Sequence, residues 1–83
     1  MSHALRLQGH DELDDSRICY WKTDRCWVIY LPNCGIGELL NHQVAEHEDG
    51  TITVTPSILM HGHKGGAPTT QHGYLTRGEW REV

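Results

Sequence analysis

The segment from Asp49 to His63, DGTITVTPSILMHGH, constrains the fold more than any other part of the chain. Asp49-Gly50 is a typical hairpin turn, because glycine tolerates the positive φ angles that such turns require. After the turn, hydroxyl side chains occupy odd positions and apolar side chains occupy the even positions Ile52, Val54, Pro56, Ile58 and Met60. This period of two predicts a β-strand with one buried and one polar face. Pro56 lacks a backbone donor and therefore indicates an edge strand, a bulge or a crossing between sheets.

The hairpin that contains this turn can pair in two registers. A two-residue loop places Ala45 opposite Val54, whereas a three-residue loop with a bulge at Gly50 places Val44 there. A shift of one residue moves every side chain to the other face of the sheet. We prefer the three-residue loop, because it puts Val44 on the apolar face together with Ile52 and Val54.

The segment that precedes the turn, residues 38–48, is ambiguous. Its propensities favour a helix, which Asp49-Gly50 would terminate. As a strand, the same residues would pair with the alternating run that follows the turn. We expect a strand over residues 42–48 and allow one turn of helix over residues 37–41.

An earlier hairpin is predicted from residues 17–21 and 26–31, which are rich in β-branched and aromatic side chains. The polar residues 22–25 separate them and form the loop. If Trp21 pairs with Cys26, then Tyr20 faces Trp27 and Cys19 faces Val28. The second strand is apolar on both faces, which indicates a central position in its sheet.

The cysteines are expected to be thiols. In the register above, Cys19 and Cys26 are diagonal neighbours about 7–8 Å apart. That separation is at or beyond the reach of an unstrained disulfide. The chain has three cysteines in all, an odd number that fits a reducing compartment better than a disulfide scaffold.

A last hairpin is predicted from residues 73–76 and 79–83, with Arg77-Gly78 as its turn. Two segments are expected to be loops. Residues 32–37 contain one proline and two glycines. Residues 61–72 are polar and rich in glycine, and we expect them to form the longest loop, of the kind that is functional or disordered in compact domains.

The 83 residues provide room for one domain. Residues 1–16 are acidic after a short apolar stretch at 4–7, which could be an edge strand or a first helical turn; we expect a solvated loop or mobile N-terminal arm. Residues 17–83 form the β core. The sequence therefore predicts an all-β fold, or a β-dominated α+β fold, as a small roll or open barrel built from hairpins.

Composition excludes several classes of partner. The net charge is −4 and the seven Lys and Arg residues form no run, which argues against nucleic acid. No apolar run approaches the roughly 20 residues of a membrane span, and the N-terminus lacks a signal-peptide core. We expect a soluble intracellular protein. Small domains commonly add a metal, a disulfide or an oligomer for stability, so a homo-oligomer stays open.

One constellation of side chains could hold a metal. Its members are Cys34, His61, His63 and His72, with His42 or His47 as alternates. Zinc takes four nitrogen or sulfur ligands in a tetrahedron. His61 and His63 are two residues apart, so in extended chain they point the same way and can share one ion. Zinc is therefore the cofactor to consider, with a domain that holds no cofactor as the alternative.

An enzyme is the less favoured reading. Cys34 as a thiolate with a histidine of the 61–72 loop as base would form a hydrolytic pair. Such a pair needs an orienting group and oxyanion donors, and no motif supplies them. Ser57 follows a proline within a strand and is expected to be structural. We predict no catalytic residue.

A binding module is the favoured class. Exposed aromatic side chains beside a glycine-rich loop are typical of protein contacts. Trp21, next to its turn, is the aromatic residue most expected to be exposed, while the alternative is that all six aromatics fill a core without phenylalanine. The expected ligand or partner residues are Trp21, His61, His63, His72 and Tyr74.

Two stretches carry a resemblance to a known family. Leu31-Pro32-Asn33-Cys34-Gly35 is a cysteine-containing glycine turn, and Thr55-Pro56-Ser57-Ile58-Leu59 is followed by a loop and by the hairpin from His72 to Trp80. Over residues 26–83 the chain resembles small phage and prophage proteins that are sometimes labelled ammonia monooxygenases. Longer members have a cysteine where this chain has Gln71.

The resemblance implies a virus-encoded accessory protein that acts in the bacterial cytoplasm, with a phage or host protein as its partner. It does not imply an oxygenase, because the chain has neither membrane segments nor a set of copper ligands. The expected function is therefore a non-enzymatic interaction module. A zinc-binding domain, or a ligand-binding or hydrolytic protein using Cys34 and the histidines of residues 61–72, is the alternative.

Overall fold

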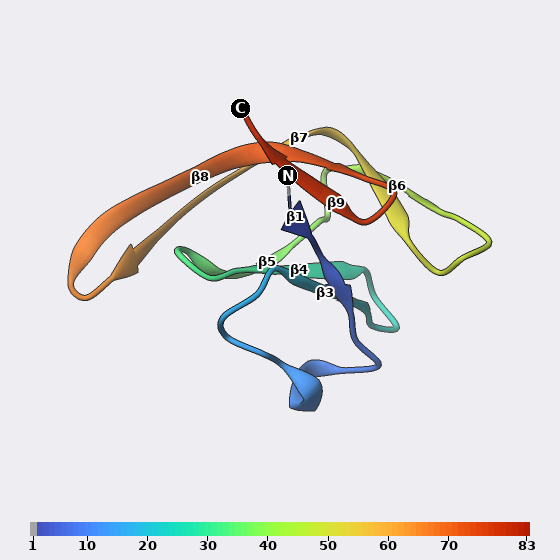
Figure 1. The fold of residues 1–83 in the computed structure, drawn as a ribbon, viewed down its shortest axis with the longest axis horizontal. Coiled ribbons are helices and arrows are strands. Elements are labelled where there is room, and N and C mark those ends of the chain that lie inside the picture. Colours follow the sequence, from blue (N-terminus) through green and yellow to red (C-terminus); the bar gives the residue numbers. More distant parts are fainter. Residues whose placement is uncertain (1) are drawn as a thin grey trace.

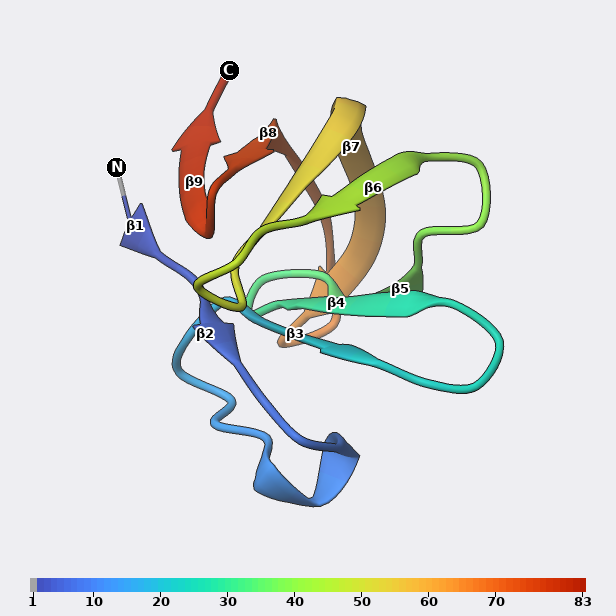
Figure 2. The same cartoon turned by 90° about the vertical axis from the view of Figure 1, so that its right-hand side faces the viewer.

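Two β-sheets form the molecule in the computed structural model, which describes residues 2–83 (Figures 1 and 2). The first sheet has the strand order β1-β9-β8-β7-β6 and the second has the order β2-β3-β4-β5. The strands are β1 (Ser2–His3), β2 (Leu5–Arg6), β3 (Cys19–Lys22), β4 (Trp27–Leu31), β5 (Gly35–Glu38), β6 (Gln43–Glu46), β7 (Ile52–Lys64), β8 (Ala67–Thr76) and β9 (Glu79–Glu82). The described helical structure is one short 3₁₀ turn, His10–Glu12. The predicted all-β class is confirmed.

The main core lies between the two sheets. It consists of buried side chains from both, namely Ile18, Tyr20, Trp27, Ile29, Leu31, Leu39, Ile52, Val54, Ile58, Leu75 and Trp80. Tyr20 and Trp27 pack with their ring centres 6.3 Å apart. Burial of these large apolar surfaces is the main force that holds the sheets together.

A second cluster lies on the opposite face of the smaller sheet and contains Trp21. The predicted exposure of Trp21 is wrong, because only 4% of the residue is accessible. The indole packs with Leu7, Cys19 and Val28, and the His10 ring lies 6.0 Å from it. The N-terminal segment folds over this face of the sheet, which a pattern confined to the hairpin itself does not reveal.

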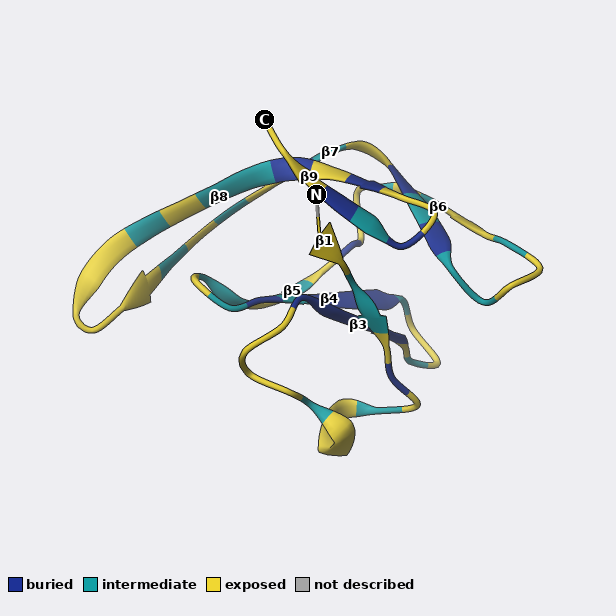
Figure 3. Cartoon of the chain, in the orientation of Figure 1, coloured by how far each residue is buried: buried dark blue, intermediate teal, exposed yellow. Residues whose placement is uncertain are grey.

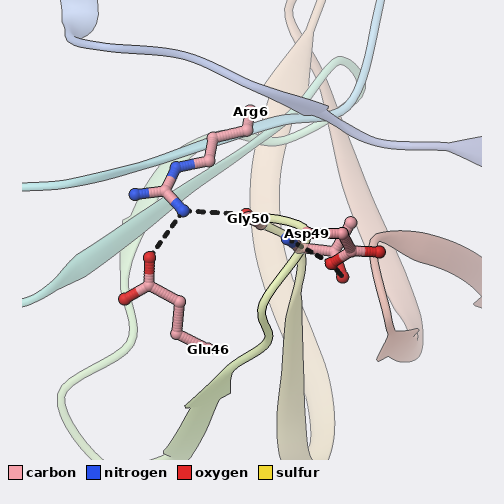
Figure 4. Close-up of polar contacts among 5 residues, drawn as sticks. Arg6, Glu46, Asp49 and Gly50 are labelled. Atoms are coloured by element: carbon pink, nitrogen blue, oxygen red, sulfur yellow. Dashed lines mark hydrogen bonds and ion pairs between the residues drawn. The ribbon is translucent and has the colours of Figure 1, made fainter.

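The N-terminal segment joins both sheets. β1 pairs with β9 at the edge of the larger sheet, and β2 runs parallel to β3 at the edge of the smaller one. The edge-strand alternative for residues 4–7 is thus the one observed. Arg6 Nη1 donates to Glu46 Oε2 at 2.7 Å and to the carbonyl oxygen of Gly50 at 2.8 Å (Figure 4). These contacts connect β2 to the β6–β7 hairpin of the other sheet.

The β3–β4 hairpin forms as predicted but in a register shifted by two residues. Tyr20 lies opposite Ile29, and Lys22 lies opposite Trp27. The cause is Thr23, whose hydroxyl oxygen accepts from the backbone N–H of Cys26 at 3.1 Å and draws this residue into the turn. An even shift leaves each side chain on its predicted face. All three cysteines are free thiols, and the central position of β4 is confirmed.

The β6–β7 hairpin adopts the preferred register. Val44 lies opposite Val54, and the N–H of His47 donates to the carbonyl oxygen of Thr51 at 2.8 Å. Gly50 has a φ of 87°, as the three-residue loop requires. The helical alternatives for residues 38–48 and 37–41 are wrong. β5 pairs with β4 over Gly35–Glu38 and β6 pairs with β7 over Gln43–Glu46, and these pairings use backbone groups that a helix would have bonded.

Of the three alternatives for Pro56, a bulge is the one observed, and the predicted C-terminal hairpin is observed as well. Val54 lies opposite Leu75 and Ile58 opposite Gly73, so three residues of β7 stand against one of β8. Because β7 gains two residues here, Val54 and Ile58 stay on the same buried face. At the other end of β8, Arg77 and Gly78 form the turn with φ angles of 48° and 77°.

The expected long loop over residues 61–72 is wrong, and so is much of the expected loop at 32–37. β7 continues to Lys64, and β8 begins at Ala67. Between them Gly65 and Gly66 have φ angles of 61° and 84°, the values of a two-residue type I′ turn. Two consecutive glycines favour a tight hairpin turn, and here they connect the two strands of a long ribbon.

Candidate functional site

A long ribbon extends beyond the strands that flank it, and we name its residues 58–72 the β7–β8 arm, most of which is exposed (Figures 1 and 3). β6 pairs with β7 only over Ile52–Thr55, and β9 pairs with β8 only over Gly73–Thr76. Within residues 2–83, the arm therefore has no strand beside either of its outer edges. Unpaired edges of this kind are where a further strand can add.

The arm rests on the rest of the molecule through its inner face. A Cβ at Gly62 would collide with the backbone of Cys34, so the turn at residues 32–34 approaches β7 as closely as a chain can. Thr69 Oγ1 donates to the carbonyl oxygen of Asn33 at 2.6 Å, and Lys64 Nζ donates to Asn33 Oδ1 at 3.0 Å. These contacts fix the arm in place.

The predicted ligand Cys34 lies on that inner side. Its Sγ donates to the carbonyl oxygen of Met60 at 3.4 Å and lies 3.6 Å from Thr69 Oγ1. In the β7–β8 register Met60 and Gly62 face inward, so alternation puts His61 and His63 on the outer face. The sheet thus stands between Cys34 and the histidines.

His72 shares the outer face, because it lies opposite Leu59. His42 and His47 bond elsewhere: His42 Nε2 donates to the carbonyl oxygen of Ser57 at 3.1 Å, and His47 Nε2 lies 2.7 Å from Thr53 Oγ1. Among residues 2–83, no group of three or more His, Cys, Asp or Glu side chains is placed to hold one metal ion. The four predicted ligands are therefore not brought together in a single chain.

Tyr74 stands beyond the arm, with 41% of the residue accessible and the Arg81 guanidinium 5.3 Å from its ring centre. Leu59 on the outer face is 55% accessible. Together with His61 and His63, they give the outer side of β7 and β8 a mixed apolar and imidazole surface.

Ser57 and His72 form a contact that the sequence did not indicate. The Ser57 hydroxyl lies 2.8 Å from His72 Nε2, across the bulge. Recognising Gly65-Gly66 as a turn would have placed these residues near each other. A serine nucleophile also needs its base oriented by a third group and a pair of oxyanion donors. No carboxylate bonds to His72 in the described chain, and the pair joins β7 to β8.

The two edges of the arm differ in what they present. A two-residue turn is closed by a hydrogen-bonded pair, here Lys64 and Ala67, and bonded and non-bonded pairs then alternate. The N–H and C=O groups that point outward on β7 are thus those of Leu59, His61 and His63. On β8 the outward residues are Pro68, Thr70 and His72.

On the β8 edge, some of the outward backbone N–H and C=O groups are missing or already bonded, whereas the β7 edge presents all of its outward groups. Pro68 has no N–H, and the carbonyl oxygen of His72 already accepts from Val83 N–H at 2.9 Å. The three outward residues of β7 keep all their donors and acceptors. The outer edge of β7, defined by Leu59, His61 and His63, is therefore the place on the arm where an extended segment can pair.

Charge is distributed unevenly around this edge. Residues 50–78 contain no Asp or Glu, so all 11 carboxylates of the chain lie outside this stretch.

A hollow of about 490 Å³ lies at the two hairpin turns, lined by Glu46, His47, Glu48, Asp49 and Arg77. The hydrogen bond from Arg6 holds the pKa of Glu46 below its usual value, and bonds from Thr51 lower the pKa of Asp49. Of the predicted site residues, this hollow contains only the alternate ligand His47.

Comparison with known proteins adds no relative. No family model matches the chain, and no curated protein or solved structure matches it either. In the described residues, no helix has the length and apolar character needed to cross a membrane. The geometry of the arm is thus the basis for a functional proposal.

Proposed function

We propose that this protein is a non-enzymatic interaction module that binds an extended segment of a protein along the outer edge of β7. The observation that carries the proposal is the row of unpaired backbone groups at Leu59, His61 and His63, beside a β8 edge that is blocked. Strand addition of this kind derives affinity from main-chain hydrogen bonds and specificity from alternate side chains.

The fixed position of the arm supports this function. Contacts from Thr69 and Lys64 to Asn33, together with the close packing at Gly62, hold the ribbon against the smaller sheet. A rigid edge loses little conformational entropy when a partner binds, which leaves more of the interaction energy as affinity. The exposed Leu59 beside the edge would add apolar contact with the incoming segment.

The biological setting is also a proposal. The resemblance of residues 26–83 to small phage and prophage proteins supports an accessory role in the cytoplasm of an infected bacterium, with a phage or host protein as partner. No catalytic step is part of this function.

A peptide-display selection tests the edge directly. Leu59→Pro removes one outward N–H of β7 without breaking a β7–β8 hydrogen bond. Thr70→Pro makes the same change on the blocked β8 edge and is the matched control. Peptides selected on the natural protein should bind the Thr70→Pro variant with similar affinity and the Leu59→Pro variant at least tenfold more weakly. Equal binding to the two variants, with both folded by circular dichroism, would refute the β7 edge as the docking site.

A further inference from the structure

His61 and His63 lie side by side on the outer face of β7 and together could contribute two ligands to a metal ion. They are two residues apart in a regular part of the strand, both are exposed, and Gly62 between them faces inward. Residues at this spacing have Cα atoms about 6.7 Å apart. Their imidazoles can share one ion, but no third His, Cys, Asp or Glu of the described chain is placed to join them.

Thr70 prepares one of the two rings for metal binding. His61 Nδ1 lies 3.1 Å from Thr70 Oγ1, its direct cross-strand neighbour. With Nδ1–H donating to that hydroxyl oxygen, Nε2 carries the lone pair that a metal requires. Histidine ligands in zinc sites regularly have this second hydrogen bond, which fixes the ring and its tautomer.

A second copy of the chain can supply the missing ligands through the same edge. In an antiparallel β7–β7 pairing with its twofold axis at Gly62, His61 of each copy lies opposite His63 of the other. Both residues present their backbone groups outward, so these would be hydrogen-bonded pairs with Cα atoms about 5.5 Å apart. Four imidazoles then stand at the corners of a rectangle of roughly 5.5 by 6.7 Å on one face, which fits one tetrahedral ion with Zn–N bonds of about 2.0–2.1 Å.

The surroundings do not oppose this pairing. Lys64, the one lysine or arginine of the arm, has its ammonium bound to Asn33 on the inner face. No carboxylate lies within residues 50–78 to compete for the ion or to repel a second arm. Leu59 of each copy would lie opposite Gly65 of the other, where no side chain obstructs it.

We propose that two copies of this chain pair through the outer edges of β7 and bind one zinc ion with His61 and His63 of both. The inference rests on the proposed function, since it uses the same edge, and it names that edge's occupant as a second copy. The ion binds neutral imidazole nitrogens, and no covalent or redox step is involved.

Sedimentation equilibrium of the tag-free protein, with zinc chloride or with EDTA, tests the proposal. With zinc the mass should double from 9.5 kDa, with one zinc ion per two chains. His61→Ala and His63→Ala should each remain monomeric with zinc, whereas His3→Ala, which removes an exposed histidine outside the arm, should still dimerise.

Three outcomes would overturn the zinc site: a monomer at saturating zinc, one zinc bound per monomer, or a zinc-dependent dimer that survives both arm substitutions. The proposed function is judged separately. If zinc causes no dimer but Leu59→Pro still abolishes peptide binding, the docking edge stands and only the metal-bridged partner is refuted.

Discussion

Gly62→Ala is the most informative single change, because the arm depends on the close approach at this residue. A Cβ at position 62 would collide with the carbonyl oxygen, Cα and carbonyl carbon of Cys34, and these backbone atoms cannot turn aside as a flexible side chain could. Overpacking of this kind costs about 1–3 kcal/mol. The loss of unfolded-state freedom returns about 0.4–1 kcal/mol. We therefore expect a net destabilisation of about 0–2.6 kcal/mol.

Urea unfolding followed by tryptophan fluorescence measures this change. Leu59→Ala is the control, since Leu59 is on the same strand but exposed, and surface changes usually stay within about 0.5 kcal/mol. The substitution should also lift the arm from Asn33 and Cys34, so the Cys34 thiol should react faster with a maleimide. If Gly62→Ala matched the natural protein in both stability and thiol reactivity, the close packing of the arm would be refuted.

Other predictions follow from the core and the surface. Trp21→Ala should lower the free energy of unfolding by about 3–5 kcal/mol in urea titrations, because the indole is buried under the N-terminal segment; an effect below about 1 kcal/mol would contradict that burial. In native protein Cys19 should be the last thiol to react with an alkylating reagent, as mass spectrometry would show, and fast labelling would contradict its full burial. The pKa of Glu46 is lowered chiefly by its bond to Arg6, so the pair stabilises the fold above the unfolded pKa of a glutamate, and that contribution disappears as the pH falls through the folded pKa. Arg6→Gln should therefore flatten the acid limb of a stability–pH curve, and an unchanged limb would show that the pair contributes nothing.

Local turn chemistry explains which parts of the fold could be predicted from the sequence. The β6–β7 register follows from Gly50 and the apolar face of Ile52 and Val54, and the C-terminal hairpin follows from Arg77-Gly78. In both, the residues that decide the structure are close together in the chain.

The observed β3–β4 register differs from the predicted one by two residues because the Thr23 hydroxyl oxygen accepts a hydrogen bond from the N–H of Cys26. A register chosen from the pairing of apolar side chains does not include the free energy of that hydrogen bond. The faces were still correct, since the shift was even.

The arm and its site were missed for a different reason. Residues 61–72 are polar on both faces, so no hydrophobic alternation marks them as strands, and the sequence pattern predicts a loop where Gly65-Gly66 forms a tight turn. Consequently Cys34 was grouped with histidines that lie across the sheet from it. The burial of Trp21 depends on a chain segment distant in sequence, which no local pattern contains.

Amide hydrogen exchange at β7, measured by NMR in the presence of EDTA, tests the account most directly. In the isolated chain the amides of Met60, Gly62 and Lys64 should be protected by β8, whereas those of Leu59, His61 and His63 should exchange rapidly. Addition of a selected peptide should protect these three as well. Protection of Leu59, His61 and His63 in the isolated chain, or their continued rapid exchange in the complex, would contradict the claim that β7 presents a free edge on which a partner strand docks.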